Sequence, residues 1–529
     1  MPSWITAQSI RHAERCLHIG DFFYLPLPLT EKECRSVCRS LDVDSDLMAE
    51  ISRNGASAGW GGFQPQNRVF LLAETALRRY ENRGEWPAWL GRAPKLLGRA
   101  ADIERVLRSV DTNPLAIVAN FPYASVPYVV LEDGFVEQVV RTFGLFRLSN
   151  IAQLGFLHDP ILTEKDGSPY MGTTFSHNRY HHVLNVAALM NLMAANNGLS
   201  PQDHAKAVFA GLTHDALTPA GGDSIKVIDQ KAFDEDLNYP ELLASKDWSV
   251  LRQAYNLDPE DMHLIIQGKG PIGAMLNLAD KLSYVSYDAW VYVQRYGNRG
   301  PRPCSKGPEH VAIGRLVRKL GNFCDLWDCF RIVDGQGVVT DPLRLADFLE
   351  LRALLFRQFY WHQGSRFLEF IVGTVLTAHL YRSGALSRQE LLTMDDDELK
   401  HILEANFSIP FALWSAKTLG EPSVKVFKEE DMALEHESEL RREGHDFVFF
   451  EKMPPRIKSS THMLVQDRDG CIKPLSQASP NRARRIEEFC VLEHPYRVYC
   501  LRHPIRTPAL VKAIEAYRTN REKRLSPPP

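Results

Sequence analysis

Apolar side chains recur every three or four residues through the middle of the chain, which is the spacing of helices that bury one face or more. The segments with this pattern are residues 182–197, 203–214, 272–296 and 343–381. A short extended run, YVVLEDGFVEQVV, precedes them from about Tyr128, and a Gly- and Pro-rich stretch at 293–310 predicts a loop. The pattern therefore predicts a mainly α fold with a helical core in the middle of the chain.

The hydrophobic pattern changes toward both ends of the chain. Residues 1–126 mix helical patterns with Gly and Pro, and no motif in this N-terminal extension indicates a role. Residues that favour β-strands gather in VKVF, DFVFFEK and YRVYC, which predicts a small α+β C-terminal appendage over residues 421–510. The helical core is then expected at 127–420 and a tail at 511–529, in which RTNREKRLSPPP, residues 518–529, is expected to fray.

The composition excludes several classes of protein. Hydrophobic residues make up 44% and charged residues 24% of the 529 residues, as in ordinary globular proteins. With 62 Lys and Arg against 65 Asp and Glu, the net charge is −3, so no overall basic field recruits nucleic acid. No stretch approaches the ~20 apolar residues that span a bilayer, and no secretory signal pattern opens the chain. We therefore expect a soluble, cytoplasmic protein with no membrane partner.

Cysteine chemistry is not expected to carry the function. The nine cysteines are scattered, and none forms the CxxC pair that a sulfur-based zinc site requires. Free thiols in a reducing compartment are the simplest interpretation of an odd number of cysteines.

Candidate chemistry is concentrated in the predicted helices of the core. His182 ends the run SHNRYHH, His214 and Asp215 lie in FAGLTHDALTP, and Asp280 lies in LNLADKLSYV. Two imidazoles and two carboxylates form a mixed nitrogen and oxygen site that suits Mn²⁺, Mg²⁺, Fe²⁺, Ni²⁺ or Zn²⁺ without selecting among them. A metal there would act as a Lewis acid and lower the pKa of its bound water.

The His-Asp dipeptide is weak evidence by itself, because two more copies occur at 158–159 and 445–446. His181 is a rival to His182, and the residues alone do not separate the two. The surroundings strengthen the hypothesis: an apolar helix precedes the dipeptide, a turn containing Thr-Pro follows it, and a second histidine and a later aspartate stand at suitable distances.

Helical geometry adds a second argument around Asp280. Asp280, Tyr284 and Asp288 recur every four residues, so one helix face presents a carboxylate, a phenol and a carboxylate. Lys281 lies one step round the helix and could reach an anion bound beside the metal.

Further cations and aromatic rings accompany this helix face. Arg352 and Tyr360 are eight residues apart and are expected on one face of a later helix, and Arg179 precedes His182 by three residues. A metal surrounded by Arg179, Lys281 and Arg352, with two tyrosines nearby, describes a pocket for a nucleoside triphosphate.

Five ordered motifs carry a resemblance to a known family. After LEDGFVE they are RLSNIAQLG at 147–155, SHNRYHH at 176–182, HD at 214–215, DKLSYVSYD at 280–288 and RALLFRQFYWH at 352–362. SPNRARRI and YRVYC follow in the order that the family shows. Over about residues 127–505, the chain resembles the HD-domain deoxynucleoside triphosphate triphosphohydrolases, and among them the SAM-and-HD-domain type.

The resemblance implies a role for each matching residue. It implies metal ligands at His182, His214, Asp215 and Asp280. It implies phosphate contacts from Arg179, Lys281 and Arg352. It implies that the sugar and base are held by Gln153, Leu154, Tyr284, Asp288 and Tyr360. In the family, metal-activated water attacks the α-phosphorus of a dNTP and releases deoxynucleoside and intact tripolyphosphate, and members are commonly homo-oligomers.

The chain departs from the family at the residues expected to transfer protons. Thr218 stands where the family has a catalytic histidine after the His-Asp dipeptide, and a hydroxyl cannot shuttle protons near neutral pH as imidazole can. Asp223 lies near the position of a second family histidine, and Asp234 replaces a further one beside the retained Glu235. We therefore expect Asp223, Asp234 and Glu235 to carry the acid–base chemistry, and the alternative is that they only face solvent.

Two other departures change the expected pocket. Trp361 replaces a glutamine beside Tyr360, and the insertion HDPILTEKDGSPYMGTT between Gln153 and Arg179 lengthens a loop over the site.

Three hypotheses about function remain open. The first is a metal-dependent dNTP triphosphohydrolase with a nucleotide substrate. The second is an HD-type nucleotidase or phosphodiesterase that releases phosphate or a monophosphate. The third is a catalytically decayed protein that binds nucleotides or, weakly, nucleic acid through the basic runs at 481–485 and 518–524. Product identity separates the first two, and salt-dependent binding tests the third.

Overall fold

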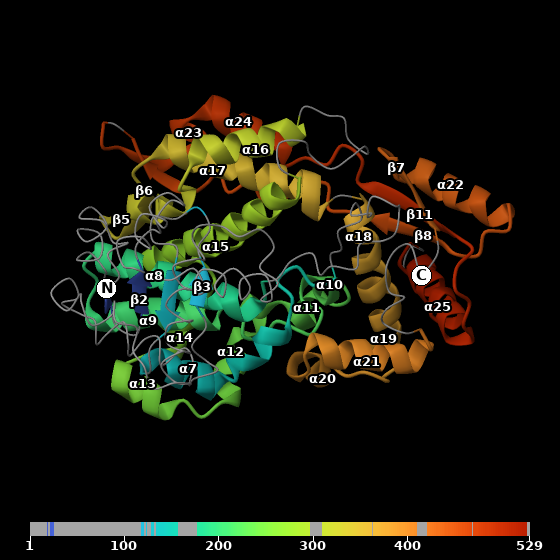
Figure 1. The fold of residues 1–529 in the computed structure, drawn as a ribbon, viewed down its shortest axis with the longest axis horizontal. Helices are drawn as coiled ribbons and strands as arrows, with labels where there is room; N and C mark the ends of the chain where they lie inside the picture. Colours follow the sequence, from blue (N-terminus) through green and yellow to red (C-terminus); the bar gives the residue numbers. More distant parts are fainter. Residues whose placement is uncertain are drawn as a thin grey trace, which may run out of the picture.

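The computed structural model describes residues 134–156, 177–296, 309–361, 363–409, 421–467 and 469–525, with Tyr123 and four short strands ahead of them. Most of this part of the chain is helical and its strands form small sheets, so the predicted mainly α fold is confirmed. Figure 1 shows a larger and a smaller group of helices, with the long helix α15 (Gly270–Tyr296) crossing the larger one. No helix in the described ranges is long and apolar enough to cross a membrane.

The larger group is built around α8 (Arg179–Asn196), which packs against both α9 (Pro201–Thr213) and α15. Almost every residue of α8 is buried, as expected for a helix with neighbours on several sides. Asn178 caps α8 by accepting the backbone N–H of His181, and Ser200 caps α9 in the same way. Shorter helices surround this centre: α7 (Phe135–Phe143), α10 (Asp223–Lys226), α11 (Gln230–Phe233), α12 (Glu235–Ser245), α13 (Ser249–Tyr255) and α14 (Pro259–Ile266).

A small antiparallel sheet precedes α7 in the chain. Its strands are β1 (His18–Ile19), β2 (Phe22–Leu25), β3 (Val118–Asn120) and β4 (Tyr128–Leu131), in the order β1-β2-β4-β3. Strands from two distant segments of the first 131 residues therefore belong to one sheet.

A further layer covers α15 on the side away from α9 (Figure 1). Helices α16 (Glu309–Leu320) and α17 (Pro342–Leu355) pack together, with the 3-10 segment η2 (Phe323–Cys329) and the hairpin of β5 (Phe330–Val333) and β6 (Gln336–Val339) between them in sequence. A later part of the chain adds β9 (Leu464–Gln466), β10 (Ile472–Pro474), α23 (Leu475–Ala478) and α24 (Pro480–Phe489). Because β9 pairs with β6 and α24 packs on α17, residues 464–489 lie on the helical core.

The smaller group joins a helical arm to a three-stranded sheet. The arm consists of α18 (Gln363–Glu369), the π-helical η4 (Phe370–Thr377), α19 (Ala378–Arg382), α20 (Arg388–Thr393) and α21 (Asp396–Phe407). The sheet has the order β7-β11-β8, with β7 (Glu421–Phe427), β11 (Tyr496–Arg502) and β8 (Val448–Lys452) all antiparallel.

Both faces of this sheet are covered by helices. Phe449 and Tyr499 belong to one apolar cluster with η4 and α25 (Pro508–Leu525), whereas Val448 and Val498 belong to another with α22 (Glu430–Arg442). Neighbouring residues of a strand point to opposite faces, so the unbroken apolar run in DFVFFEK serves two cores. The predicted α+β appendage is confirmed as a structural element.

Four expectations about secondary structure are wrong in part. The helix expected at 343–381 is interrupted, because π-helical turns at η3 (Phe356–Tyr360) and η4 separate α17, α18 and α19. The extended run from Tyr128 ends at Leu131, and α7 follows from Phe135. The last residues were expected to fray, but α25 continues to Leu525 because Tyr517 packs in the core and Arg521 pairs with Glu437 at 2.7 Å. The expected loop at 293–310 begins later, since α15 reaches Tyr296, and the residues after it lie outside the described ranges.

Candidate active site

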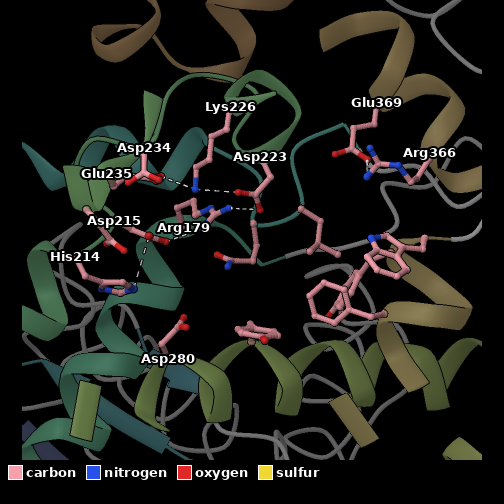
Figure 2. A pocket seen from close by; sticks show the side chains of 17 residues that line it. Arg179, His214, Asp215, Asp223, Lys226, Asp234, Glu235, Asp280, Arg366 and Glu369 are labelled. Carbon is pink, nitrogen blue, oxygen red and sulfur yellow. Dashed lines mark hydrogen bonds and ion pairs between the residues drawn. The ribbon is translucent and has the colours of Figure 1, made fainter. Parts of the chain in front are cut away.

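A pocket of about 530 Å³ lies between the two groups of helices. One wall carries His214, at the end of α9, with Asp215 and the α15 residue Asp280. Residues of α10 and of the start of α12 form a second wall. Residues of η3 and α18 form a third wall, and Figure 2 shows Arg366 and Glu369 across the pocket from His214 and Asp280.

Two imidazoles meet here because α8 and α9 approach each other closely. Gly211 lies one turn before His214, and a Cβ on it would lie 2.6 Å from the Cα of Ala187 in α8. Only glycine permits this distance between the helices. As a result, the Nε2 atoms of His182 and His214 are 3.2 Å apart.

Each imidazole is oriented by a partner on its other nitrogen. His214 Nδ1 lies 2.9 Å from the carbonyl oxygen of Gly211, which can only accept, so Nδ1 carries the proton and Nε2 presents a lone pair. His182 Nδ1 lies 3.0 Å from Ser283 Oγ on α15. Burial lowers the pKa of His182, which keeps its ring neutral. Metal-binding histidines commonly have such a second partner.

Two carboxylates complete the cluster. Asp280 Oδ1 lies 3.3 Å from His182 Nε2, and the two oxygens of Asp215 lie 3.7 Å from His182 Nε2 and 3.8 Å from His214 Nε2. The ligand atoms of His182, His214 and Asp215 all lie within 4.8 Å of one another and could hold a metal ion. Neutral nitrogens and ionised oxygens converging on one point fit a divalent cation, although they do not identify it.

His181 lies outside this cluster among the described residues. Its backbone N–H is bonded to the Asn178 cap, and burial lowers the pKa of its ring to about 4. The helix therefore directs the second of the two adjacent histidines, His182, toward α9 and α15.

Arg179 connects the candidate metal site to the second wall. Its guanidinium donates to Asp215 Oδ2 at 2.6 Å and to Asp223 Oδ2 at 2.8 Å, as Figure 2 shows. Burial opposes ionisation of Asp215, but Arg179 and the two nearby imidazoles hold the pKa of this carboxyl well below its usual range. Burial also opposes ionisation of Asp223, and Lys226 with Arg179 nevertheless lowers its pKa to about 2. Both carboxylates are thus ionised at neutral pH.

Lys226 continues this alternation of charges. Its Nζ lies 2.9 Å from Asp223 Oδ1 and 2.7 Å from Glu235 Oε1. Thr218 Oγ1 donates to the same Glu235 oxygen at 2.8 Å. Burial raises the pKa of Glu235 although Lys226 opposes that shift. The threonine at the position of the expected catalytic histidine is therefore buried and orients a glutamate.

The three residues expected to carry acid–base chemistry have three different environments in the structure. All three line the pocket, but Asp223 is tied to two cations, and Asp234 Oδ1 caps α12 by accepting the backbone N–H of Leu237 at 3.0 Å. Glu235 lies at the first position of α12, with its carboxyl directed to Lys226 and Thr218. Asp236 also lines the pocket, and burial raises its pKa to about 6.

The residues expected to hold the sugar and base are divided between the pocket surface and the layer behind it. Gln153, Leu154, Tyr284 and Tyr360 line the pocket. Asp288 is completely buried, where Tyr360 Oη donates to its Oδ2, and burial raises the pKa of Asp288 to about 7. The insertion expected over the site lies outside the described residues.

Two of the three residues expected to contact phosphate, Arg352 and Lys281, do not line the pocket and are hydrogen-bonded to other protein groups. Arg352 donates to the hydroxyl of Tyr284 and, at 2.8 Å, to the carbonyl oxygen of Lys458. Lys281 donates to the carbonyl oxygen of Asn277 at 3.1 Å, and burial lowers its pKa to about 8. Arg179 is the member of the expected set that lines the pocket.

Several lining residues were not found from the sequence. They are Lys226, Asp236, Phe356, Arg366 and Glu369. Lys226 follows Asp223 by three residues and Arg366 precedes Glu369 by three, which is the spacing of ion pairs on a helix. Such spacing is common on exposed helices, so it carried no signal that these pairs face a pocket.

Comparison with known proteins supports the fold alone. No family model and no curated protein sequence matches the chain. A hypothetical protein from Aquifex aeolicus is similar in structure, with a TM-score of 0.50 and 16% identity over 74% of this chain and 96% of that one. A phosphohydrolase from Bacteroides thetaiotaomicron is similar with a TM-score of 0.51 and 16% identity over 73% of this chain and all of that one.

Proposed function

We propose that the chain is a metal-dependent phosphohydrolase that acts on nucleotides, and that dNTPs are hydrolysed to deoxynucleoside and tripolyphosphate. The observation that carries the proposal is the convergence of His182, His214, Asp215 and Asp280 at the wall of a pocket large enough for a nucleotide. The similarity in fold to a protein described as a phosphohydrolase supports the reaction class. The ordered sequence motifs support the substrate class.

The four residues would hold one divalent cation, which when bound supplies Lewis acidity toward a phosphoryl oxygen and lowers the pKa of water. Arg179 is rigid because two carboxylates fix its guanidinium at the pocket wall, so it can orient a phosphate oxygen without losing side-chain freedom on binding. The phenol ring of Tyr284, fixed by Arg352, offers an apolar surface for the sugar.

Glu235 is the residue we assign to proton transfer. Burial raises the pKa of Glu235, so its carboxyl takes up a proton more readily than an exposed glutamate and could give that proton to the oxygen of the leaving nucleoside. Lys226 and Thr218 hold the carboxyl in place, so the threonine replaces the expected histidine in position but not in chemistry. Asp223 stays ionised and positions Arg179 and Lys226, and Asp234 stabilises the start of α12.

One observation favours a second candidate, a nucleotidase or phosphodiesterase with a less charged substrate. Among the described lining residues, seven carry carboxyl groups and three carry Lys or Arg side chains. An excess of negative charge repels a triphosphate more strongly than a monophosphate or diester. A triphosphate would therefore need more bound metal cations to offset the carboxylates of the pocket than a phosphate monoester would.

Product analysis tests the proposal and separates the two candidates. Protein loaded with Mn²⁺, Mg²⁺ or Fe²⁺ is incubated with each dNTP and rNTP, and the products are resolved by ion exchange. Tripolyphosphate with deoxynucleoside supports the proposal, whereas orthophosphate or a monophosphate supports the second candidate. No turnover of these triphosphates with any metal would overturn the proposal, and the same result with deoxynucleoside monophosphates and a phosphodiester would overturn the second candidate as well.

Variants connect the activity to the site. His182→Ala and Asp280→Ala are expected to lower kcat/KM by at least about a hundredfold, because each removes a ligand atom. His181→Ala removes the adjacent imidazole of the same helix and is expected to stay within about threefold of wild type. Equal losses of activity in His181→Ala and His182→Ala would show that both substitutions act by disturbing helix α8 and not by removing a metal ligand.

A further inference from the structure

The wall opposite the candidate metal site carries a donor and an acceptor side by side. Arg366 and Glu369 lie on α18, line the pocket and are drawn together in Figure 2, across from His214 and Asp280. Arg366 Nη1 lies 2.9 Å from Glu369 Oε2. Neither residue has a part in the proposed hydrolysis, so their place at the pocket needs another explanation.

The pair is held rigidly by the C-terminal sheet. Arg366 donates through Nε and Nη2 to Glu451 Oε1 on β8, at 3.2 and 3.1 Å. Tyr499 on β11 donates to the other Glu451 oxygen at 2.7 Å. Arg497, also on β11, donates to the carbonyl oxygen of Trp361, another lining residue. The direction of the Arg366 guanidinium is therefore fixed before any ligand binds.

Glu369 keeps unused hydrogen-bonding capacity. The residue is 7% exposed, and its Oε2 receives no hydrogen bond from any described residue although Arg366 is close. Arg366 Nη1 has two N–H groups, of which Glu369 can take at most one. A buried carboxylate that is ion-paired with Arg366 but receives no hydrogen bond from it suits a ligand that offers donors and an acceptor on one edge.

We propose that Arg366 and Glu369 recognise the base of the nucleotide and select guanine, an inference that rests on the proposed function of the same pocket. The Watson–Crick edge of guanine presents O6 as an acceptor, followed by N1–H and the 2-amino group as donors. Arg366 Nη1 would donate to O6, and the Glu369 carboxylate would accept from the two donors. Phe356 and Trp361, which also line the pocket, supply apolar surface for the ring faces.

The other bases fit this pair less well. Adenine would place its 6-amino donor against the Arg366 donor, and cytosine would place its 4-amino group there. Thymine can satisfy Arg366 through O4 and Glu369 through N3–H, but its O2 would then face the carboxylate. A site that leaves buried polar groups unpaired with the wrong ligand discriminates far more strongly than one that only measures shape.

Steady-state kinetics with single nucleotides tests the inference. The full-length protein is assayed with dGTP, dATP, dCTP and dTTP, and with dITP, which keeps O6 and N1–H but lacks the 2-amino group. We expect kcat/KM for dGTP to exceed that for dATP and dCTP by at least about tenfold, with dITP between them. Glu369→Gln keeps the shape of the side chain and is expected to bring the ratio of dGTP to dATP close to one.

A matched control separates base recognition from a structural role of the ion pairs. Glu437 is a buried glutamate in α22 that pairs with Arg441 at 2.6 Å and Arg521 at 2.7 Å, and it is not a lining residue. Glu437→Gln makes the same chemical change in the same part of the molecule and is expected to leave the ratio of dGTP to dATP unchanged. Glu369→Asp keeps the charge and, by shortening the side chain, is expected to lower the ratio partially.

The outcomes distinguish this inference from the proposed function. Equal kcat/KM for all bases, or an unchanged ratio in Glu369→Gln, overturns base recognition while hydrolysis stands. If no nucleotide is hydrolysed, calorimetric titration with dGTP and dATP decides: selective binding of dGTP that Glu369→Gln abolishes supports the inference and overturns the hydrolytic proposal. Absence of turnover and of binding overturns both.

Discussion

Two imidazole nitrogens 3.2 Å apart, with carboxylate oxygens within 3.3 to 3.8 Å of them, are a strained arrangement unless something positive lies between them. His214 Nδ1 faces the carbonyl oxygen of Gly211, so its Nε2 is the nitrogen that points toward His182. The cluster of His182, His214 and Asp215 could hold a divalent cation, and in the proposed function Asp280 would add a fourth ligand.

The partner of His182 gives a test of that interpretation. Ser283→Ala removes the group beside Nδ1 of His182 without touching a ligand atom, and we expect the affinity for Mn²⁺ to fall by about ten- to a hundredfold. Isothermal titration measures this affinity directly. Ser286→Ala removes another buried hydroxyl one turn along α15, whose Oγ donates to the Ser283 carbonyl, and it should leave the affinity unchanged. Equal losses in both variants would contradict an orienting role for Ser283.

Asp288 predicts a dependence of stability on pH. Burial raises its pKa to about 7 in the folded protein, whereas an unfolded chain has a value of about 3.9. Below the lower value both states are protonated and no penalty exists. As the pH rises toward 7 the unfolded state loses this proton first, so the free energy of unfolding falls by up to about 4 kcal/mol. Asp288→Asn removes this loss.

The measurement compares thermal denaturation midpoints of wild type and Asp288→Asn at pH values of about 5 and 8. The variant should gain stability relative to wild type at the higher pH. Asp469→Asn changes an exposed aspartate and should show no such trend. A constant difference between Asp288→Asn and wild type at both pH values would contradict the raised pKa.

At the scale of elements, the start of α21 fixes two turns that border the pocket. Asp396 accepts the backbone N–H of Ala152 at 2.9 Å and that of Gly221 at 2.6 Å. The first turn carries Gln153 and the second leads into Asp223, so one carboxylate aligns two walls of the pocket. Both of its oxygens are needed, because each N–H would otherwise be buried without an acceptor.

Asp396→Asn therefore has a predictable effect. One of the two N–H groups would face an amide NH₂ instead of an oxygen, and we expect a loss of about 1–3 kcal/mol in stability. Faster hydrogen exchange at Ala152 and Gly221 is the direct measurement. Asp397→Asn, at the next position with a side chain 71% exposed, should leave exchange at both amides unchanged.

At the scale of the whole molecule, the C-terminal sheet contributes to the pocket although no strand of it lines the pocket. Glu451 on β8 accepts from Arg366 on α18 and from Tyr499 on β11, and Arg497 lies 3.8 Å away. These buried charges connect α18, which lines the pocket, to the C-terminal sheet. Removing one member leaves the others without compensation in a dry environment, which is costly.

Glu451→Gln is therefore expected to lower stability by about 3–5 kcal/mol, seen as a fall in Tm of about 5 °C or more. The difference in Tm between Glu451→Gln and wild type should persist in about 1 M NaCl, because salt screens buried charges only weakly. Glu430→Gln breaks a more exposed pair with Lys452 at 2.7 Å and should change stability by less than about 1 kcal/mol. A fall in Tm that disappears in salt would contradict the buried network.

The sequence by itself determined the fold class and the helices that carry the chemistry. The three- and four-residue spacing predicted α8, α9 and α15 because buried helices need apolar side chains on several faces, and this property is local. The runs in VKVF, DFVFFEK and YRVYC likewise predicted β7, β8 and β11. The type and order of the candidate ligand residues were also visible, since His, Asp and their spacing are properties of the chain.

Only the tertiary structure decided which of those side chains meet and what they do there. Helix α8 directs His182 rather than His181 toward α9 and α15, and Gly211 lets α9 approach α8 so that His182 and His214 meet. Lys226 and Glu369 line the pocket because helices from different parts of the chain pack around it. Arg352 does not line the pocket, and its guanidinium donates a hydrogen bond to the hydroxyl of Tyr284. Charge pairing and burial depend on neighbours brought together by folding, so no local pattern could have assigned these roles.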